Sequence, residues 1–191
     1  SAGWRISGEN FMKDSKTIND LKLRGSWGKV GNDEGIGDYA YLKLYSINAQ
    51  GEYNLQNPAN DRLSWEKTTQ TNIGLDLSMF NSRITFTADA YLKKTNDLLI
   101  NVQLPPSSGF ASQAYNVGAM ENKGLEFVLS TKNFDREKFK WSTDLNFSLN
   151  RNKVTDLGST TQSLDFAGIY ERDAAVRIVT GKPLGSFYGY V

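Results

Sequence analysis

The chain has 191 residues and nearly balanced charge, with 22 Lys plus Arg against 21 Asp plus Glu. So small a net charge provides no field to attract nucleic acid, and no nucleic-acid partner is expected. Cysteine and histidine are both absent, which excludes disulfides, Cys/His zinc sites, thiol nucleophiles and imidazole bases. Mean hydropathy is −0.49, and no apolar run approaches the ~18 residues of a membrane helix. These values do not exclude a membrane β-barrel, because the polar lumen face of a barrel lowers its mean hydropathy.

The first third of the chain predicts one long strand followed by an extended loop region. Polar and apolar residues alternate at 21–27, which predicts a strand over about 21–30. A cluster of glycines and acids at 31–38 predicts a loop. The aromatic stretch 39–47 predicts a short strand that lies within this outer loop, and the polar stretch 48–62 predicts further loop.

Two hairpins dominate the middle of the chain. Strict alternation predicts that 64–79 pairs with 83–101 around the turn Asn81-Ser82, and that 114–132 pairs with 138–154. Each run approaches the roughly 9 to 11 residues that a tilted strand needs to cross a bilayer. The apolar rows are Ile73, Leu75, Leu77 and Met79; Ile84, Phe86, Ala88, Ala90 and Leu92; Leu125, Phe127 and Leu129; and Trp141, Thr143, Leu145, Phe147 and Leu149.

The intervening residues form a polar row that is expected to face a wet interior, because a charge aimed at lipid costs roughly 2 to 4 kcal/mol at the midplane. A solvated face of a soluble sheet is the alternative interpretation of each residue. This row comprises Asn72, Asp76, Ser78, Thr85, Thr87, Asp89, Tyr91, Glu126, Ser130, Asp144, Asn146 and Ser148.

Connection lengths also alternate along the chain. Long connections at 31–62, 102–113 and 155–183 separate tight turns at 80–82 and 133–138. Outer-membrane barrels have short periplasmic turns and long extracellular loops. Phe80, Phe134, Phe139 and Trp141 flank the tight turns, where they are expected either to form an interfacial girdle or to close the bottom of a soluble sandwich.

The C-terminal part is less regular. Residues 164–180 have no clear pattern, Gly181-Lys182-Pro183 interrupts the chain, and a β pattern resumes at 184–191. The predicted fold class is all-β: an antiparallel meander of about six long strands that forms part of a transmembrane β-barrel wall, with long extracellular loops.

No catalytic, cofactor-binding or metal site is predicted. Gly-Lys pairs are followed by Val30 and Pro183, so neither is a Walker loop, and a glycine triplet lacks the dinucleotide spacing. The acids Asp33 and Glu34 are expected to be solvated rather than catalytic. With Asn32 and Asp38 they offer oxygen ligands to calcium, although the spacing is not that of an EF-hand. Loop aromatics can stack on sugars or pack among themselves: Tyr39, Tyr41, Tyr45, Tyr53, Phe110 and Tyr115.

Several phrases spread over the chain resemble the SusC/RagA-like TonB-dependent transporters of the Bacteroidota outer membrane. They are Trp4-Arg5-Ile6-Ser7 with Phe11-Met12; Leu21-Lys22-Leu23-Arg24-Gly25-Ser26-Trp27-Gly28 with Gly31-Asn32; Trp65-Glu66-Lys67-Thr68; Asn72-Ile73-Gly74-Leu75-Asp76; Asp89-Ala90-Tyr91; Thr95-Asn96-Asp97-Leu98-Leu99; Asn116-Val117-Gly118; Asn122-Lys123-Gly124-Leu125-Glu126; and Gly181-Lys182-Pro183-Leu184-Gly185-Ser186-Phe187-Tyr188-Gly189-Tyr190.

The resemblance implies a barrel of about 22 strands, of which residues 1–191 form a segment of the wall. It implies import of large nutrients, glycan oligosaccharides or peptides, beneath a SusD-like surface lipoprotein, with energy delivered through TonB. The plug domain, the TonB box, the signal peptide and the terminal closing strand are not in this sequence, so the chain is expected to be a piece of a longer product. An enzyme is not expected, and no residue can be assigned a substrate contact.

A soluble extracellular β-sandwich, either an adhesin or a carbohydrate-binding module, is the main alternative. In such a protein the apolar rows pack against a second sheet, so Ile73, Leu75, Phe86 and Ala88 are expected in a closed core. In a barrel the same side chains face lipid.

Overall fold

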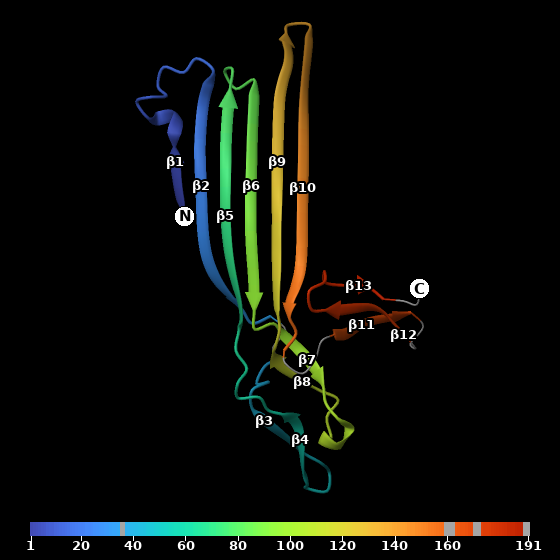
Figure 1. Ribbon diagram of the computed structural model, residues 1–191. Helices are drawn as coiled ribbons and strands as arrows, with labels where there is room; N and C mark the ends of the chain where they lie inside the picture. Colours follow the sequence, from blue (N-terminus) through green and yellow to red (C-terminus); the bar gives the residue numbers. More distant parts are fainter. Residues whose placement is uncertain (35–36, 159–162, 170–172, 189–191) are drawn as a thin grey trace. The chain divides into compact units, whose positions relative to one another are not determined.

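A six-stranded antiparallel sheet forms the main part of the structure. The computed structural model describes residues 1–34, 37–158, 163–169 and 173–188. The strand order is β1-β2-β5-β6-β9-β10, with successive long strands running in opposite directions (Figure 1). These strands are Ala2–Arg5, Ile18–Asn32, Glu66–Met79, Ile84–Asn96, Ala119–Arg136 and Phe139–Asp156. The all-β antiparallel meander is therefore confirmed; five strands are long, with 13 to 18 residues each, and β1 has four.

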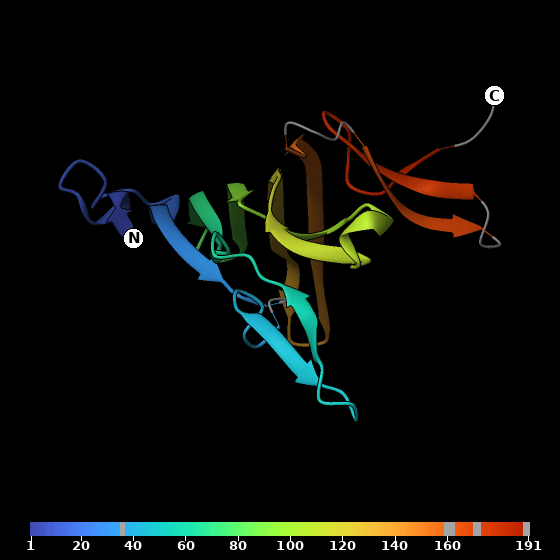
Figure 2. The ribbon, with the colours of Figure 1, turned by 90° about the horizontal axis from the view of Figure 1, so that it is seen from below.

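The chain divides into two compact units, which we describe separately. Unit 1 comprises Ser1–Gly28, Thr69–Lys93 and Asn122–Asn152, and contains most of the large sheet. Unit 2 comprises Lys29–Thr68, Lys94–Glu121 and Lys153–Val191. Its additional strands are β3 (Lys43–Ile47) with β4 (Tyr53–Pro58), β7 (Leu99–Gln103) with β8 (Ser112–Asn116), and β11 (Ser163–Ile169) with β12 (Asp173–Val179) and β13 (Ser186–Phe187). Figure 2 shows the paired ribbons of these small sheets.

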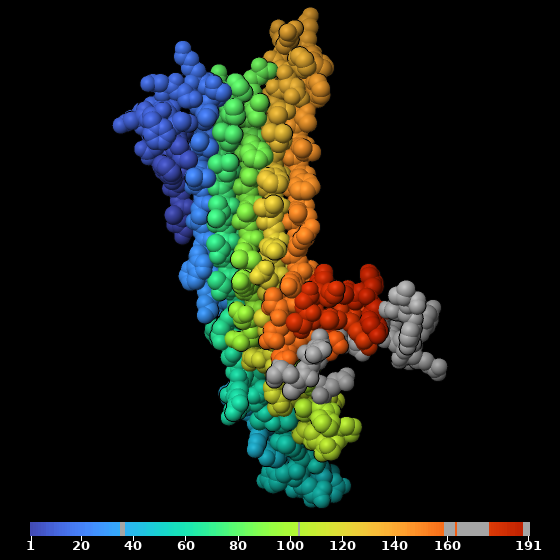
Figure 3. All heavy atoms as spheres, in the orientation of Figure 1, coloured from blue at the N-terminus to red at the C-terminus, as the bar shows by residue number. Residues whose placement is uncertain are grey.

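The apolar row of unit 1 lies on one face of the sheet and stays open. Phe127 stacks between Phe86 and Phe147 of the neighbouring strands, with ring centroids 6.1 Å apart on each side. The exposed fractions of Ile73 and Leu145 are 63% and 59%. Figure 3 shows one face of the sheet, along which the atoms of β5, β6, β9 and β10 lie side by side. The closed core required by a soluble sandwich is therefore not found at these positions.

The tight turns lie at one end of the sheet in unit 1 (Figure 1). Phe80, Asn81 and Ser82 all have positive φ, at 54°, 55° and 59°, a conformation that costs non-glycine residues roughly 1 to 2 kcal/mol each. Because this conformation reverses the chain within few residues, β6 starts at Ile84. The second turn is shorter than predicted, since β9 ends at Arg136 and β10 begins at Phe139.

Exposed aromatic rings gather at this end of the sheet. Phe134 stacks on Trp141 and lies tilted against Phe139, with both centroid distances 5.9 Å. Phe80 beside the first turn is 47% exposed, and Trp141 is 52% exposed. These rings do not close a core, and their exposure matches the predicted girdle.

Two of the predicted strands are broken where alternation predicts continuity. Residues 83–101 form β6 and β7, which Asp97 separates with φ of 57°. Residues 114–132 form β8 and β9, which Gly118 separates with φ of 98°. A left-handed residue redirects the chain, so β7 pairs with β8 as a separate two-stranded sheet. The predicted continuous hairpins are wrong at these ends.

The long connection after β2 contains more structure than predicted. The strand expected within 39–47 is β3, and it stays outside the large sheet, as predicted. The stretch 48–62 was expected to be loop, but it contains β4, which pairs antiparallel with β3 from Ile47↔Tyr53 to Lys43↔Pro58. Pro58 is tolerated because it is the last residue of β4. The strand β1 was also not predicted, since its residues do not alternate.

The C-terminal stretch without a clear pattern forms β11 and β12, which pair antiparallel. Of the β pattern expected at 184–191, only β13 is a strand, and 189–191 lie outside the described residues, as do 159–162 of the predicted connection. The side chains of Val154 and Leu157 in unit 2 are buried, with 1% and 4% exposed. None of the described residues belongs to a helix that has the length and apolarity to span a bilayer.

Candidate functional site

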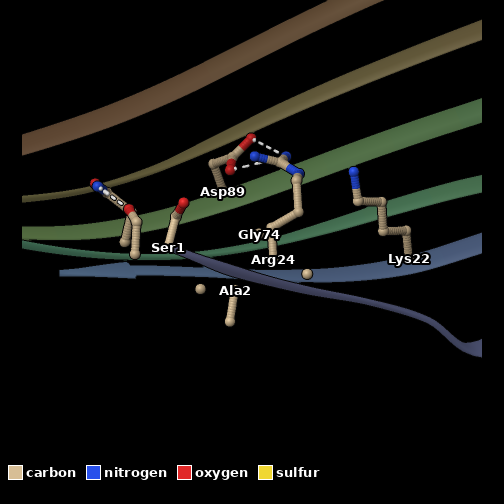
Figure 4. Close-up of a pocket in the computed structure, with 10 residues that line it drawn as sticks. Ser1, Ala2, Lys22, Arg24, Gly74 and Asp89 are labelled. Atoms are coloured by element: carbon tan, nitrogen blue, oxygen red, sulfur yellow. Dashed lines mark hydrogen bonds and ion pairs between the residues drawn. The ribbon is translucent and has the colours of Figure 1, made fainter.

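An ion cluster crosses three strands on the polar row of unit 1. The Arg24 guanidinium on β2 donates from Nε to Asp76 Oδ2 at 2.7 Å and from Nη2 to Asp76 Oδ1 at 3.0 Å. The same Nη2 donates to Asp89 on β6 at 3.0 Å, as Figure 4 shows. Each of the three side chains is about one third exposed, at 37%, 35% and 32%. One cation thus links two carboxylates on two strands.

Gly74 gives the guanidinium room to pass over β5. A Cβ added at Gly74 would lie 2.7 Å from Arg24 Cζ and would also overlap the Asp89 carboxylate. Any larger residue would therefore displace the ion pairs. Gly74 is itself buried, because the Arg24 side chain covers it. The sequence therefore needs glycine at this position for a close approach and not for a turn.

A shallow hollow of about 300 Å³ opens beside this cluster. Asn72 donates to the Ser26 hydroxyl at 2.9 Å on the same surface. Figure 4 shows Lys22 near the Arg24–Asp89 pair, and Ser1 and Ala2, the first residue of β1, also line the hollow. The hollow offers ammonium, amide and hydroxyl groups that can contact polar solutes.

The predicted polar row is partly confirmed by its contacts. Asn72, Asp76 and Asp89 meet in this region, and the Tyr91 ring covers Gly124 of the neighbouring strand, where a Cβ would lie 2.6 Å from the ring. Glu126, Asp144, Asn146 and Ser148 are exposed on β9 and β10 and are not gathered into a site.

Arg24 and Gly74 were missed by sequence reasoning. The signal for Arg24 was available: Lys22, Arg24 and Ser26 alternate with apolar residues on β2, which places them on one face. The signal for Gly74 was its place inside the predicted strand 64–79, because an isolated glycine within a strand suggests the close approach of another group.

The described residues of the acidic loop are not gathered around a common point. Asn32 Oδ1 accepts the Glu34 N–H at 3.2 Å, and Asn32 Nδ2 donates to Glu66 at 3.2 Å. Asp33, Glu34 and Asp38 are exposed. Among residues 1–34, 37–158, 163–169 and 173–188, no group of three or more acids lies close enough together to hold a metal ion.

The outer-loop tyrosines are mostly exposed. Tyr45 and Tyr53 pack edge to face across β3 and β4, with centroids 6.5 Å apart, and remain 57% and 73% exposed. Tyr39 and Tyr41 are 62% and 54% exposed. Tyr115 instead donates its hydroxyl to Gln113 at 2.7 Å, so it serves packing within unit 2. Phe110 is half-buried.

Long antiparallel strands with one open apolar face, one ion-paired polar face and aromatic rings at the turn end define the wall of a membrane β-barrel. A family model described as "TonB dependent receptor-like, beta-barrel" matches residues 4–185. The chain belongs to this family, as a SusC/RagA-like segment of the barrel.

Relatives of known name cover nearly all of the chain. TonB-dependent receptor P26 of Formosa agariphila is 39% identical over 99% of the chain and 20% of its own length. TonB-dependent receptor SusC of Bacteroides thetaiotaomicron is 40% identical over 81% of the chain and 17% of its own length. The solved structure of the RagAB peptide transporter superimposes with a TM-score of 0.82 and 32% identity, over 97% of this chain and 20% of that chain. The chain thus spans about a fifth of the length of these relatives.

Proposed function

We propose that this chain is part of the barrel wall of an outer-membrane transporter of a Gram-negative bacterium of the Bacteroidota. The transporter imports large nutrients, either glycan oligosaccharides or peptides. The observation that carries the proposal is the match of residues 4–185 to the TonB-dependent receptor barrel. The ion-paired row supports it, because Arg24, Asp76 and Asp89 suit the aqueous lumen of a pore while the Phe86, Phe127 and Phe147 stack suits lipid.

In this proposal the chain has a passive mechanical role. Its strands close the wall, so that each backbone N–H and C=O in the hydrocarbon layer has a partner. Its polar row keeps the pore wet. Energy coupling through TonB and a plug domain belongs to portions of the parent protein outside these residues, and no catalytic step is assigned to this wall.

A SusD-like surface lipoprotein is the proposed partner at the outer side. The similarity of the chain to SusC and to the RagAB peptide transporter supports this kind of assembly. The exposed tyrosines of β3 and β4 give the outer connection rings that can stack on sugars or peptide side chains.

The complete gene tests the proposal in its native host. We expect the full-length protein in the outer-membrane fraction, co-purification of a surface lipoprotein, and loss of growth on one glycan or peptide source when the gene is deleted. Complementation with the intact gene is the control. Recovery of the full-length protein as a soluble periplasmic or secreted species would contradict the proposal.

A further inference from the structure

Asn60 is a buried polar side chain of unit 2, with 8% exposed. It lies in the connection between β4 and β5. Its Nδ2 donates to the Ala114 carbonyl on β8 at 2.9 Å, and its Oδ1 accepts the Arg62 N–H at 3.1 Å. Burial of an amide is tolerated only when its polar atoms are satisfied, and both ends of this amide have partners.

A second side-chain amide, on β8, binds the same connection between β4 and β5. Gln113 donates through Nε2 to the Ala59 carbonyl. The Tyr115 hydroxyl donates to Gln113 Oε1 at 2.7 Å, which orients the amide with its donor side toward Ala59. Ala59 has a positive φ of 50°, so this contact holds a backbone position that costs free energy for a residue with a Cβ.

Asn116 binds both backbone polar groups of Ser64. Its Oδ1 accepts the Ser64 N–H at 2.7 Å, and its Nδ2 donates to the Ser64 carbonyl at 2.6 Å. The same Nδ2 donates to the Asp97 carbonyl at 3.0 Å, at the left-handed residue where the chain leaves β6 for β7. One side chain therefore ties the start of β5 to the start of the β7–β8 hairpin.

We propose that Asn60, Gln113 and Asn116 form an amide clamp, whose members are positioning residues for the outer connection. Residues 59–64 belong to no strand, so no backbone hydrogen-bond ladder of a sheet holds them. The side chains of the clamp hold them against β8 instead. Because β4 ends at Pro58, the clamp also anchors one end of the β3–β4 hairpin that carries the exposed tyrosines. The outward placement of that hairpin rests on the proposed function.

Hydrogen exchange of the full-length protein in outer-membrane vesicles tests the clamp. In Asn116→Ala we expect amides within 59–66 to exchange about tenfold faster, because three hydrogen bonds are lost, while β5 and β6 amides keep their protection. Asn101→Ala is the matched control, since Asn101 is exposed on β7 and its side chain makes no hydrogen bond among the described residues. If Asn116→Ala does not assemble, Asn60→Ala carries the same expectation. Exchange at the wild-type rate in both clamp variants would overturn the proposal.

A distance measurement separates positioning from general stability. Spin labels at Gln50, in the turn between β3 and β4, and at Ser112 on β8 both occupy exposed sites of unit 2. We expect a narrow distance distribution in the wild type and in Asn101→Ala, and a broad one in Asn116→Ala. A narrow distribution in Asn116→Ala would contradict the clamp. Neither measurement needs a substrate. A result that contradicts the clamp therefore does not contradict the transport proposal, and a result that supports the clamp does not support the transport proposal.

Discussion

The close approach of Arg24 to Gly74 predicts that an alanine at position 74 destabilises the protein. In Gly74→Ala the new Cβ would lie 2.7 Å from Arg24 Cζ and would overlap the Asp89 carboxylate. The Arg24 side chain must then move away, and both of its ion pairs are weakened. The side chains are about one third exposed, so solvent screens each ion pair and its contribution to stability is near that of a surface pair. Weakening both pairs is expected to lower the free energy of unfolding by about 1 to 2 kcal/mol.

Replacing glycine by alanine also stabilises the protein through the unfolded chain, and the measurement must separate this effect from the loss of the ion pairs. Replacing glycine in a strand interior stabilises by roughly 0.5 to 1 kcal/mol, because the unfolded chain loses freedom. Gly28→Ala supplies this gain alone, since nothing lies within 4 Å of a Cβ at Gly28 on the same unit. We therefore expect Gly74→Ala to be about 1 to 2 kcal/mol less stable than Gly28→Ala.

The assay is urea unfolding of the full-length protein in detergent, followed by tryptophan fluorescence and compared between variants by midpoint. A mutant cycle completes it: in a background that carries both Arg24→Ala and Asp89→Ala, Gly74→Ala is expected to match Gly28→Ala, because neither the guanidinium nor the Asp89 carboxylate remains to be displaced. Equal midpoints for the two single glycine variants, or an undiminished cost of Gly74→Ala in that background, would refute the reasoning.

Three further outcomes follow from the wall. Phe127→Lys places a charge on the apolar row at a cost of roughly 2 to 4 kcal/mol near the midplane. We therefore expect less folded barrel in the outer-membrane fraction, measured by heat-modifiable gel migration. Equal amounts of folded barrel for Phe127→Lys and for the polar-row control Ser130→Lys would argue against a lipid-facing row. Gly124→Ala is expected to cost about 1 to 3 kcal/mol by overpacking against the Tyr91 ring, measured as a lower urea midpoint, and the cost should vanish in Tyr91→Ala. Ser82→Gly relieves a φ of 59° and is expected to raise the free energy of unfolding by about 1 kcal/mol, measured as a higher urea midpoint. An unchanged or lower midpoint would show that this turn is not strained.

Alternation was sufficient to predict which residues share a face. The apolar row predicted at Phe86, Phe127 and Phe147 is one aromatic stack in the structure, and Asp76 and Asp89 share one cation on the other face. This part was predictable because side-chain direction in a strand follows from the backbone period of two and needs no knowledge of the partners.

Strand ends were not predictable in the same way. Asp97 and Gly118 take left-handed conformations within runs that read as continuous strands. The partners that stabilise these breaks lie elsewhere in the chain: the Asp97 carbonyl is bound by Asn116, nineteen positions further along. Residues 93–97 are all polar, and this local pattern does not mark the residue at which β6 ends.

The sequence by itself determined the fold class, the two faces of the wall and the tight turns, because each depends on neighbours within a few positions. Only the tertiary structure decided that Arg24 serves both Asp76 and Asp89, that Gly74 is required for its passage, and that three amides of unit 2 join a strandless segment to β8. The hydrogen bonds among these contacts join residues 52 to 65 positions apart. Their geometry is set by how strands pair, which no single stretch of sequence encodes.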